Sequence, residues 1–280
     1  MTDHYAVIGN PIAHSKSPAI HTAFAHQTGQ HMEYGLLLGA LDDFAGDVRR
    51  FVAEGGRGLN VTLPFKEQAH ALLADLTPRA AAARAVNTIL VLDGGLLRGD
   101  NTDGVGLIRD LTLNNGIEVE GQRVLLLGAG GAARGVLIPL LETGPAELVI
   151  ANRTAAKALE LAERASARRP VGGCGLDGLA GRRFDLIINA TSSGLAGGVP
   201  ALPDDCLAAG GCTYDLLYAD TPTPFCRWGS AHGAARALDG LGMLVEQAAE
   251  SFTLWRGVRP DTAPVIDMLR ASAAHEGTVH

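Results

Sequence analysis

VLLLGAGGAA, residues 124–133, is the stretch that decides the fold of this chain. The apolar residues 124–127 predict a buried strand, which runs into a Gly-x-Gly-x-x-Ala turn and then into a helix-forming segment. Gly128 permits the tight turn, Gly130 lets the backbone approach a pyrophosphate, and Ala133 allows the helix to pack closely on the strand. The helix N-terminus adds unpaired N–H donors and a positive dipole end. The stretch predicts a dinucleotide-binding turn, with an ordinary strand–helix turn as the alternative.

The end of the next predicted strand indicates which dinucleotide binds. About 20 residues after the turn, an NAD-selective site carries Asp or Glu, but this chain has Asn152, Arg153 and Thr154. A carboxylate would repel a 2′-phosphate, whereas the guanidinium of Arg153 can bind one through charge-assisted hydrogen bonds. Lys157 adds a cation in the first helical turn, where the dipole favours anions. These residues favour NADP. The alternative, a capping Thr154 and a solvated Arg153, leaves Lys157 unexplained.

Short β-rich runs alternate with longer helical segments along the chain. The runs are 5–8, 59–61, 86–91, 124–127, 148–150 and 186–188. This alternation predicts the α/β class, because parallel strands need crossover connections and these are usually helices. A helix expected from Asp103 ends in Asn-Asn-Gly, and a second apolar helix opens after Gly240. We therefore expect domain boundaries after residues 103 and 239.

Composition and charge exclude several classes of protein. A length of 280 residues suits two domains at roughly 150 residues each. The net charge of −7 disfavours a broad nucleic-acid or anionic-membrane footprint, and no apolar run approaches the ~20 residues that span a bilayer. The four cysteines form no C-x-x-C pair, and the first residues carry no targeting pattern. We expect a globular cytoplasmic protein with reduced thiols.

Polar side chains cluster where strands of the first hundred residues end. They are Ser15, Ser17, Asn60, Thr62, Lys66, Asn87, Thr88 and Asp103. In open parallel sheets the carboxyl ends of strands line the ligand crevice, so these side chains are expected to converge. Hydroxyls, amides, one ammonium and one carboxylate suit a small polyhydroxylated acid. Taken singly, each residue has a structural alternative as a helix cap, a loop former or a solvated lysine. The nine histidines show no metal-binding spacing, so no metal is predicted.

With these clusters the sequence resembles the shikimate dehydrogenase family, the NADP-dependent enzymes that reduce 3-dehydroshikimate to shikimate in aromatic amino acid biosynthesis. The matching stretches are GNPIAHSKSP (9–18), NVTLPFKE (60–67), AVNTI (85–89), GDNTDG (99–104), GAGGAARG (128–135), NRT (152–154), NATSSG (189–194), YDLLY (214–218), TPF (223–225) and DGLGMLVEQAA (239–249). They span nearly the whole chain in the expected order.

The resemblance implies a fold and a site. It implies an N-terminal α/β substrate domain with a mostly parallel sheet (1–103), a Rossmann-type NADP-binding domain (104–239), and C-terminal helices (240–280) that return to the first domain. The implied substrate-binding residues are Ser15, Ser17, Asn60, Thr62, Lys66, Asn87, Asp103, Tyr218 and Gln247. The implied cofactor-binding residues are Gly128, Ala129, Gly130, Gly131, Ala132, Asn152, Arg153, Thr154, Lys157, Leu216, Gly240 and Met243.

Within this set, Lys66 and Asp103 are implied to be the catalytic pair. The reaction needs a hydride for the carbonyl carbon and a proton for the developing alkoxide. Because a neighbouring carboxylate favours the ammonium form, Lys66 suits an acid or an electrostatic stabiliser better than a base, although the sequence leaves that role open. Lys157 stands where the family often has Arg, and an ammonium cannot reproduce the stacking of a guanidinium.

Three other functions fit the sequence less well. A quinate/shikimate dehydrogenase with relaxed substrate or cofactor choice is disfavoured by Arg153. A non-catalytic NADP-binding regulator would need neither Lys66 nor Asp103. A folate dehydrogenase with a similar nucleotide domain is disfavoured by the serine motif and Gln247. The oligomeric state stays open, and a homodimer is one of the assemblies that the sequence allows.

Overall fold

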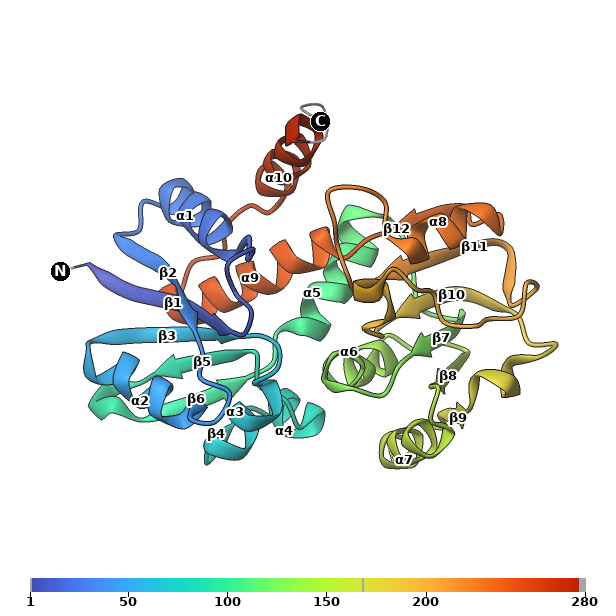
Figure 1. The fold of residues 1–280 in the computed structure, drawn as a ribbon, viewed down its shortest axis with the longest axis horizontal. Coiled ribbons are helices and arrows are strands. Elements are labelled where there is room, and N and C mark those ends of the chain that lie inside the picture. Colours follow the sequence, from blue (N-terminus) through green and yellow to red (C-terminus); the bar gives the residue numbers. More distant parts are fainter. Residues whose placement is uncertain (1, 168, 277–280) are drawn as a thin grey trace.

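Two six-stranded sheets form two lobes of the molecule (Figure 1). The computed structural model describes residues 2–167 and 169–276. The first sheet has the order β2-β1-β3-β5-β6-β4 and the second the order β12-β11-β10-β7-β8-β9. The two-domain α/β fold predicted from the sequence is confirmed.

The sheet of the N-terminal lobe is mostly parallel. Its strands are β1 (Asp3–Gly9), β2 (Met32–Leu38), β3 (Gly56–Val61), β4 (Asp75–Leu76), β5 (Thr88–Val91) and β6 (Leu97–Asp100). Only β5 among them is reversed, since it pairs antiparallel with both β3 and β6. The strand expected over 86–91 begins at Thr88, because the N–H of Val86 bonds to the carbonyl of Lys66 instead of a neighbouring strand.

Helices and short 3-10 turns link these strands. They are α1 (Ser17–Thr28), α2 (Phe44–Ala53), α3 (Lys66–Leu72), α4 (Pro78–Ala83) and the 3-10 turn Asp93–Gly95. Both α1 and α3 begin at a predicted site residue, since Ser17 opens α1 and Lys66 opens α3. The ends of β1 and β3 therefore deliver polar side chains to one edge of the sheet, as expected for parallel strands.

The sheet of the second lobe is parallel throughout its described pairs. Its strands are β7 (Arg123–Leu127), β8 (Glu147–Ala151), β9 (Gly172–Cys174), β10 (Phe184–Asn189), β11 (Leu207–Asp215) and β12 (Arg236–Leu238). The connecting helices are α6 (Gly131–Glu142), α7 (Ala155–Ala165) and α8 (Pro224–Ala231), with 3-10 turns at Leu176–Leu179 and Ser193–Ala196. This all-parallel arrangement is that of a Rossmann-type domain.

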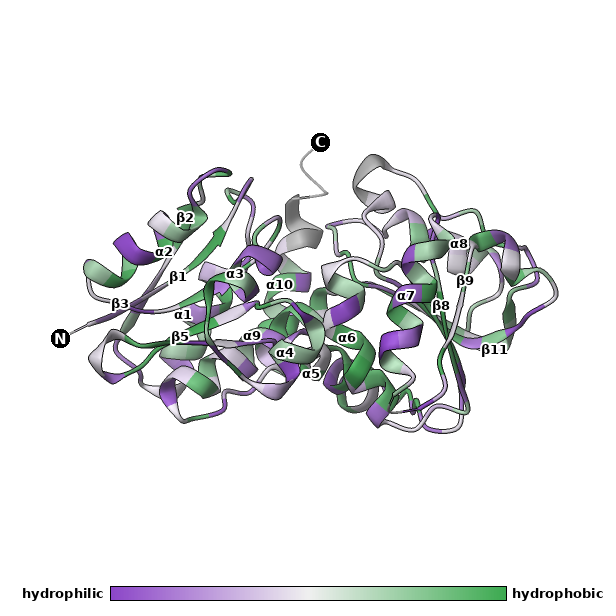
Figure 2. Ribbon diagram, turned by 90° about the horizontal axis from the view of Figure 1, so that it is seen from below, coloured by the Kyte–Doolittle hydropathy of each residue, from purple (hydrophilic) through white to green (hydrophobic). Residues whose placement is uncertain are grey.

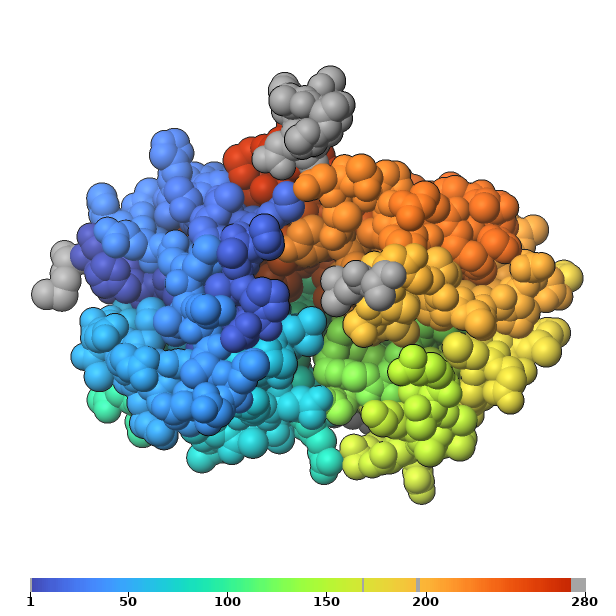
Figure 3. Space-filling view, viewed as in Figure 1, coloured from blue at the N-terminus to red at the C-terminus, as the bar shows by residue number. Residues whose placement is uncertain are grey.

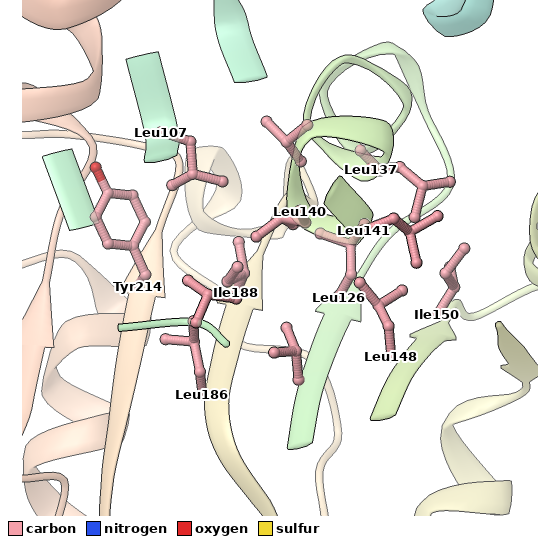
Figure 4. Packing of buried hydrophobic residues seen from close by; sticks show 14 of the residues in the cluster. Leu107, Leu126, Leu137, Leu140, Leu141, Leu148, Ile150, Leu186, Ile188 and Tyr214 are labelled. Atoms are coloured by element: carbon pink, nitrogen blue, oxygen red, sulfur yellow. The ribbon is translucent and has the colours of Figure 1, made fainter. Parts of the chain in front are cut away.

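The core of the second lobe follows from the alternation of side chains along its strands. Val124 and Leu126 of β7 pack in one buried cluster, while Leu125 and Leu127 pack in another on the opposite face. Figure 4 shows part of the first cluster, in which Leu126 lies among leucines and isoleucines of α6, β8 and β10. In Figure 2, where green marks hydrophobic residues, much of α6 and β8 is green. Each fully buried leucine contributes about 1.5–3 kcal/mol to stability.

Two helices connect the lobes. The first, α5 (Asp103–Arg109), continues as the π-helical turn Asp110–Asn114, and the second is α9 (Leu241–Arg256), which runs between the lobes in Figure 1. The last helix is α10 (Ala263–Glu276). The C-terminal helices α9 and α10 share a buried cluster with α1 of the N-terminal lobe. The residue limits 103 and 239 of the domains stay predictions.

The four cysteines are unpaired. Burial raises the pKa of the Cys206 thiol to about 11, so that thiol stays protonated at neutral pH. None of the described helices has the length and apolar character needed to cross a membrane.

Candidate active site

The glycine turn between β7 and α6 has the geometry of a phosphate-binding loop. Gly128 has a φ of +108°, and a β-carbon there would stand 3.0 Å from the carbonyl oxygen of Ala190. Gly130 is the N-cap of α6, and a β-carbon there would meet no heavy atom within 4 Å. Ala133 is fully buried against β7. The turn thus needs glycine at its start and leaves open space before the helix N-terminus, which fits a pyrophosphate.

The residues expected to read the 2′-phosphate follow β8. Asn152 donates to the carbonyl of Thr154 over 3.0 Å, which shapes the loop before α7. Thr154 is the N-cap residue of α7, but its side chain makes no capping hydrogen bond, so capping alone does not account for it. Arg153 and Lys157 are both exposed. Two exposed cations and an uncommitted hydroxyl therefore lie around the start of this helix.

Three residues expected beside the nicotinamide gather where β11 ends and α9 begins. A β-carbon on Gly240 would stand 2.3 Å from the carbonyl oxygen of Leu216, so the two segments touch there. Leu216 and Met243 pack in the same buried cluster. The backbone N–H of Leu216 donates to the carbonyl of Asn189, at the end of β10. This corner lies at the carboxyl ends of the parallel strands, where dinucleotides bind in this class of fold.

Lys66 and Asp103 meet although they are 37 positions apart in the sequence. Lys66 Nζ donates to Asp103 Oδ2 over 2.6 Å, and the side chains are 19% and 7% exposed. Asn87 Nδ2 donates to the other carboxylate oxygen, Asp103 Oδ1, over 2.8 Å. The backbone N–H of Asp103 donates to Asn101 Oδ1, which fixes the first turn of α5. The carboxylate is held on both oxygens, so the ammonium is held in one place as well.

Gln247 of α9 joins this group. Its Oε1 accepts from Asn87 Nδ2 over 3.2 Å and from Thr102 Oγ1 over 3.3 Å, and its Nε2 donates to the carbonyl of Leu244 over 2.9 Å. Asn87 Oδ1 accepts from the backbone N–H of Thr102 over 2.8 Å. The side-chain amide of Asn87, on the segment that enters β5, therefore contacts both the loop before α5 and the helix α9.

Asn60 lies beside this network and is 6% exposed. Its Nδ2 contacts Ser251 Oγ at 3.0 Å and Thr88 Oγ1 at 3.3 Å, and its Oδ1 accepts from the phenol of Tyr34 over 2.7 Å. Thr88 belongs to the polar cluster predicted from the sequence, whereas Ser251 and Tyr34 were not predicted. Ser251 follows Gln247 by one helical turn, and that spacing could have indicated it. No local pattern singles out Tyr34.

Ser15 and Ser17 lie in the loop that enters α1. Ser17 is 6% exposed, and its backbone N–H donates to Ser15 Oγ over 3.3 Å. Lys16, not Ser17, is the N-cap residue of α1, so the alternative of a capping Ser17 is wrong. Thr62 adjoins this loop, because a β-carbon on Gly9 would stand 2.5 Å from Thr62 Cγ2. The serines and Thr62 therefore share one edge of the N-terminal sheet.

Tyr218 comes from the other lobe. It packs against the buried cluster that contains Ile20 of α1 and Leu241 of α9, and burial raises its pKa. Next to it, Lys16 Nζ pairs with Asp220 Oδ1 at 3.1 Å across the lobes. These contacts place the segment after β11 against the start of α1.

The two lobes face each other along a furrow in the space-filling view (Figure 3). Glu67 of α3 forms an ion pair with Arg134 of α6, which joins the two lobes and brings the helix that begins at Lys66 to the helix that follows the glycine turn. In the part of the chain that the structure describes, no group of three or more His, Cys, Asp or Glu side chains could hold a metal ion.

A parallel sheet with a phosphate-binding turn, together with a lysine–carboxylate pair beside the N-terminal sheet, defines a dinucleotide-dependent oxidoreductase. Three family models match the chain. They are the shikimate dehydrogenase substrate binding domain over residues 7–89, shikimate/quinate 5-dehydrogenase over 111–196, and the shikimate 5′-dehydrogenase C-terminal domain over 240–270. The chain belongs to the shikimate dehydrogenase family, as the sequence resemblance predicted.

Relatives resemble the chain over nearly its whole length. Shikimate dehydrogenase (NADP(+)) from Alkalilimnicola ehrlichii is 59% identical over 96% of this chain and 99% of its own. Among solved structures, an Ael1 enzyme from Pseudomonas putida is 49% identical, with a TM-score of 0.89 over 96% of this chain and 98% of its own. Shikimate 5-dehydrogenase from Thermus thermophilus, solved with NADP(H) and shikimate, is 35% identical, with a TM-score of 0.87 over 97% of this chain and 100% of its own.

Proposed function

We propose that this chain catalyses the reversible NADP-dependent reduction of 3-dehydroshikimate to shikimate. The observation that carries the proposal is the 2.6 Å hydrogen bond between Lys66 Nζ and Asp103 Oδ2, held by Asn87 at the furrow between the lobes. A regulator that only binds NADP would have no use for an ammonium and a carboxylate fixed in this way. The relatives with the same fold and the name shikimate dehydrogenase support the reaction.

The cofactor proposed is NADP. Gly128, Ala129, Gly130, Gly131 and Ala132 would hold its pyrophosphate, since the open space before α6 and the helix N-terminus suit an anion. The chemistry that the bound dinucleotide supplies is a hydride for the carbonyl carbon of the substrate.

At the 2′-phosphate, Arg153 would be the main clamp. It would be assisted by Asn152, Thr154 and Lys157 at the start of α7. The exposed guanidinium can donate two parallel hydrogen bonds to a phosphate, whereas Lys157 acts as a point charge.

The proton step falls to Lys66. Its ammonium, held by Asp103, stabilises negative charge that develops on the substrate oxygen and gives that oxygen a proton in the direction of reduction. In the direction of oxidation the same amine takes the proton from the hydroxyl. Asp103 fixes the position of Nζ.

The substrate would lie between two groups of side chains. Ser15, Ser17, Thr62 and Tyr218 would bind its carboxylate, because they offer hydroxyl donors near the start of α1. The ring hydroxyls would bind to amides and charged groups already joined by hydrogen bonds. These residues are Asn60, Lys66, Asn87, Asp103 and Gln247.

The experiment that tests the function measures NADPH or NADH absorbance with shikimate or quinate as the second substrate. We expect turnover with shikimate and NADP⁺ to exceed turnover with the other three pairs. Absence of turnover with all of them would refute the proposal and favour a regulator. Equal turnover with shikimate and quinate would favour the quinate/shikimate alternative.

We also propose a cytoplasmic location and an assembly of two chains. The location is supported by the biosynthetic role of the family and by unpaired cysteines. For the assembly, the chain offers the edge strand β2, on which Leu36 and Leu38 are 45% and 64% exposed. Sedimentation equilibrium would test it, since a monomer mass at all concentrations would refute the dimer.

A further inference from the structure

We infer that Tyr34 is a positioning residue that sets the orientation of the Asn60 side-chain amide toward the substrate. The inference rests on the proposed function, since Asn60 is one of the residues proposed to bind a ring hydroxyl. Tyr34 lies on the edge strand β2, and its phenol reaches Asn60 Oδ1 on β3 over 2.7 Å.

The contacts of Asn60 define which end of its amide faces which neighbour. Nδ2 lies 3.3 Å from the carbonyl oxygen of Asn87, which can only accept a hydrogen bond, and 3.0 Å from Ser251 Oγ. The two N–H groups are therefore used inside the protein. Oδ1 accepts from Tyr34, and a side-chain carbonyl oxygen has two lone pairs. One lone pair thus remains for a substrate hydroxyl, which makes Asn60 an acceptor.

Tyr34 is also connected to the serine group. Burial raises the pKa of Tyr34 well above its usual value, and a hydrogen bond from the Ser17 side chain offsets part of that rise. The phenol therefore stays protonated at neutral pH and can donate to Asn60. Tyr34 thus lies between Ser17, proposed to bind the carboxylate, and Asn60, proposed to bind a ring hydroxyl.

The ring of Tyr34 is held by His21 of α1. The two rings stack with centroids 4.1 Å apart and planes 5° from parallel. His21 is fully buried, and burial lowers its pKa to about 3 against a smaller opposing effect of Asn60, so its ring is neutral. A neutral ring needs no counter-ion, and the stack fixes the direction in which the phenol points. The hydroxyl of Tyr34 can be removed without disturbing this stack.

The experiment compares Tyr34→Phe with the unchanged chain in shikimate oxidation by NADP⁺. Without the phenol, Asn60 Oδ1 loses the donor that holds it, and the amide is fixed only by the contacts of Nδ2. We expect the KM for shikimate to rise about 3–10-fold, the effect of one neutral hydrogen bond. The kcat and the KM for NADP⁺ are expected to stay within about twofold, because Lys66, Asp103 and the glycine turn are untouched.

Tyr5→Phe is the matched control. Tyr5 is the register partner of Tyr34 on the adjacent strand β1, and its phenol contacts Arg256 instead of Asn60, at 3.3 Å. The same atom is thus removed from the same sheet. We expect Tyr5→Phe to leave the KM for shikimate unchanged. An equal rise in KM for both variants would show a general structural effect and overturn the inference.

A double-mutant cycle separates positioning through Asn60 from other effects. If Tyr34 acts through Asn60, then the variant Tyr34→Phe/Asn60→Ala should have the same KM for shikimate as Asn60→Ala alone. If the fold-increases in KM of the two single variants multiply in the double variant, the inference is overturned. An unchanged KM in Tyr34→Phe would overturn it as well. Absence of shikimate turnover in the unchanged chain would instead refute the proposed function and the inference together, so the two failures are distinguishable.

Discussion

Gly135 of α6 lies so close to Asp103 that a β-carbon on the glycine would stand 3.1 Å from the carboxylate Oδ2. The same β-carbon would stand 3.2 Å from Asn101 Oδ1. The helix that begins at the phosphate-binding turn and the proposed catalytic carboxylate therefore meet with no side chain between them. This approach links the cofactor lobe directly to the Lys66–Asp103 pair.

Gly135→Ala tests whether that approach matters for catalysis. The added methyl group should displace the Asp103 carboxylate by a few tenths of an ångström and lower kcat by roughly tenfold, because small misplacements of reacting groups are costly. NADPH binding, measured by fluorescence titration, should change little, since Gly128 and Gly130 keep their geometry. Unchanged kcat would show that the pair tolerates the shift.

Lys66→Met tests the proton step. The change keeps much of the aliphatic stem and removes the donor and the charge, so kcat should fall by ~10²–10⁴-fold. Asp103→Asn should cause a similar loss, and the double variant should be little worse than the more impaired single variant, because the residues act as one unit. A folded Lys66→Met that binds NADPH and keeps more than about a tenth of the original kcat would contradict the assignment, since that ratio is only ~1.4 kcal/mol.

Arg153→Ala tests cofactor selection. NADP⁺ binding should weaken by ~1.5–3 kcal/mol, the value of a hydrogen bond to a charged group, whereas NAD⁺ binding should hardly change. The matched control is Arg164→Ala in the last turn of the same helix, where the arginine pairs with Glu160 and lies far along the helix from its start. Calorimetric titration of both cofactors measures the difference. Equal weakening for NADP⁺ and NAD⁺ would show that Arg153 does not read the 2′-phosphate.

Ser15→Ala and Ser17→Ala test the carboxylate subsite. Because the carboxylate is remote from the reacting carbon, its binding is similar in the ground and transition states, and its loss should mainly raise the KM for shikimate. Steady-state kinetics with shikimate varied at saturating NADP⁺ separates KM from kcat. A large fall in kcat at constant KM would place the serines in the chemical step.

Arg79→Met tests the ion pair that supports the loop before Asp103. Burial alone would raise the pKa of Asp100, but hydrogen bonds from Arg79 and Thr77 outweigh it, and the net pKa lies below 3.8. The pair therefore contributes stability at neutral pH that is lost as the pH falls through the lowered pKa. Because Arg79 is 27% exposed and Asp100 1%, removing Arg79 should cost about 2–4 kcal/mol at neutral pH.

The pH dependence of that loss distinguishes it from a packing defect. Without Arg79, burial favours the protonated form of Asp100, so the variant should recover part of its deficit in acid. Urea unfolding at several pH values between about 7 and 3 measures this. A deficit that stays constant with pH would show that the ion pair is not its cause.

The sequence predicted those parts of the fold and site whose signals are local. The glycine turn was predictable because Gly128 and Gly130 act within one strand–helix connection. The apolar run 186–188 predicted the strand β10, which extends from Phe184 to Asn189 in the structure. The reversal of β5 was not, since direction depends on how β3 and β6 pair with it across the sheet.

The site residues divide in the same way. Lys66 and Asp103 lie in motifs that the resemblance picks out, and the structure brings them together. Tyr34 is a lone tyrosine on an edge strand, so no local signal marks its contact with Asn60. Ser251 follows Gln247 by one helical turn, but its contact with Asn60 spans 191 positions. Such long-range contacts emerge only when tertiary packing is known.

The helix α9 carries Met243, Gln247 and Ser251 at intervals of four residues within its 16 residues. With a rise of about 1.5 Å per residue, successive members of this series lie about 6 Å apart along the axis. The helix therefore sets a fixed spacing between Met243, proposed to lie beside the nicotinamide, and Ser251, which contacts Asn60. A single residue inserted between Met243 and Gln247 would rotate Gln247 and Ser251 by about 100° around the helix axis relative to Met243. The residues proposed to contact cofactor and substrate would then no longer lie on the same face of the helix.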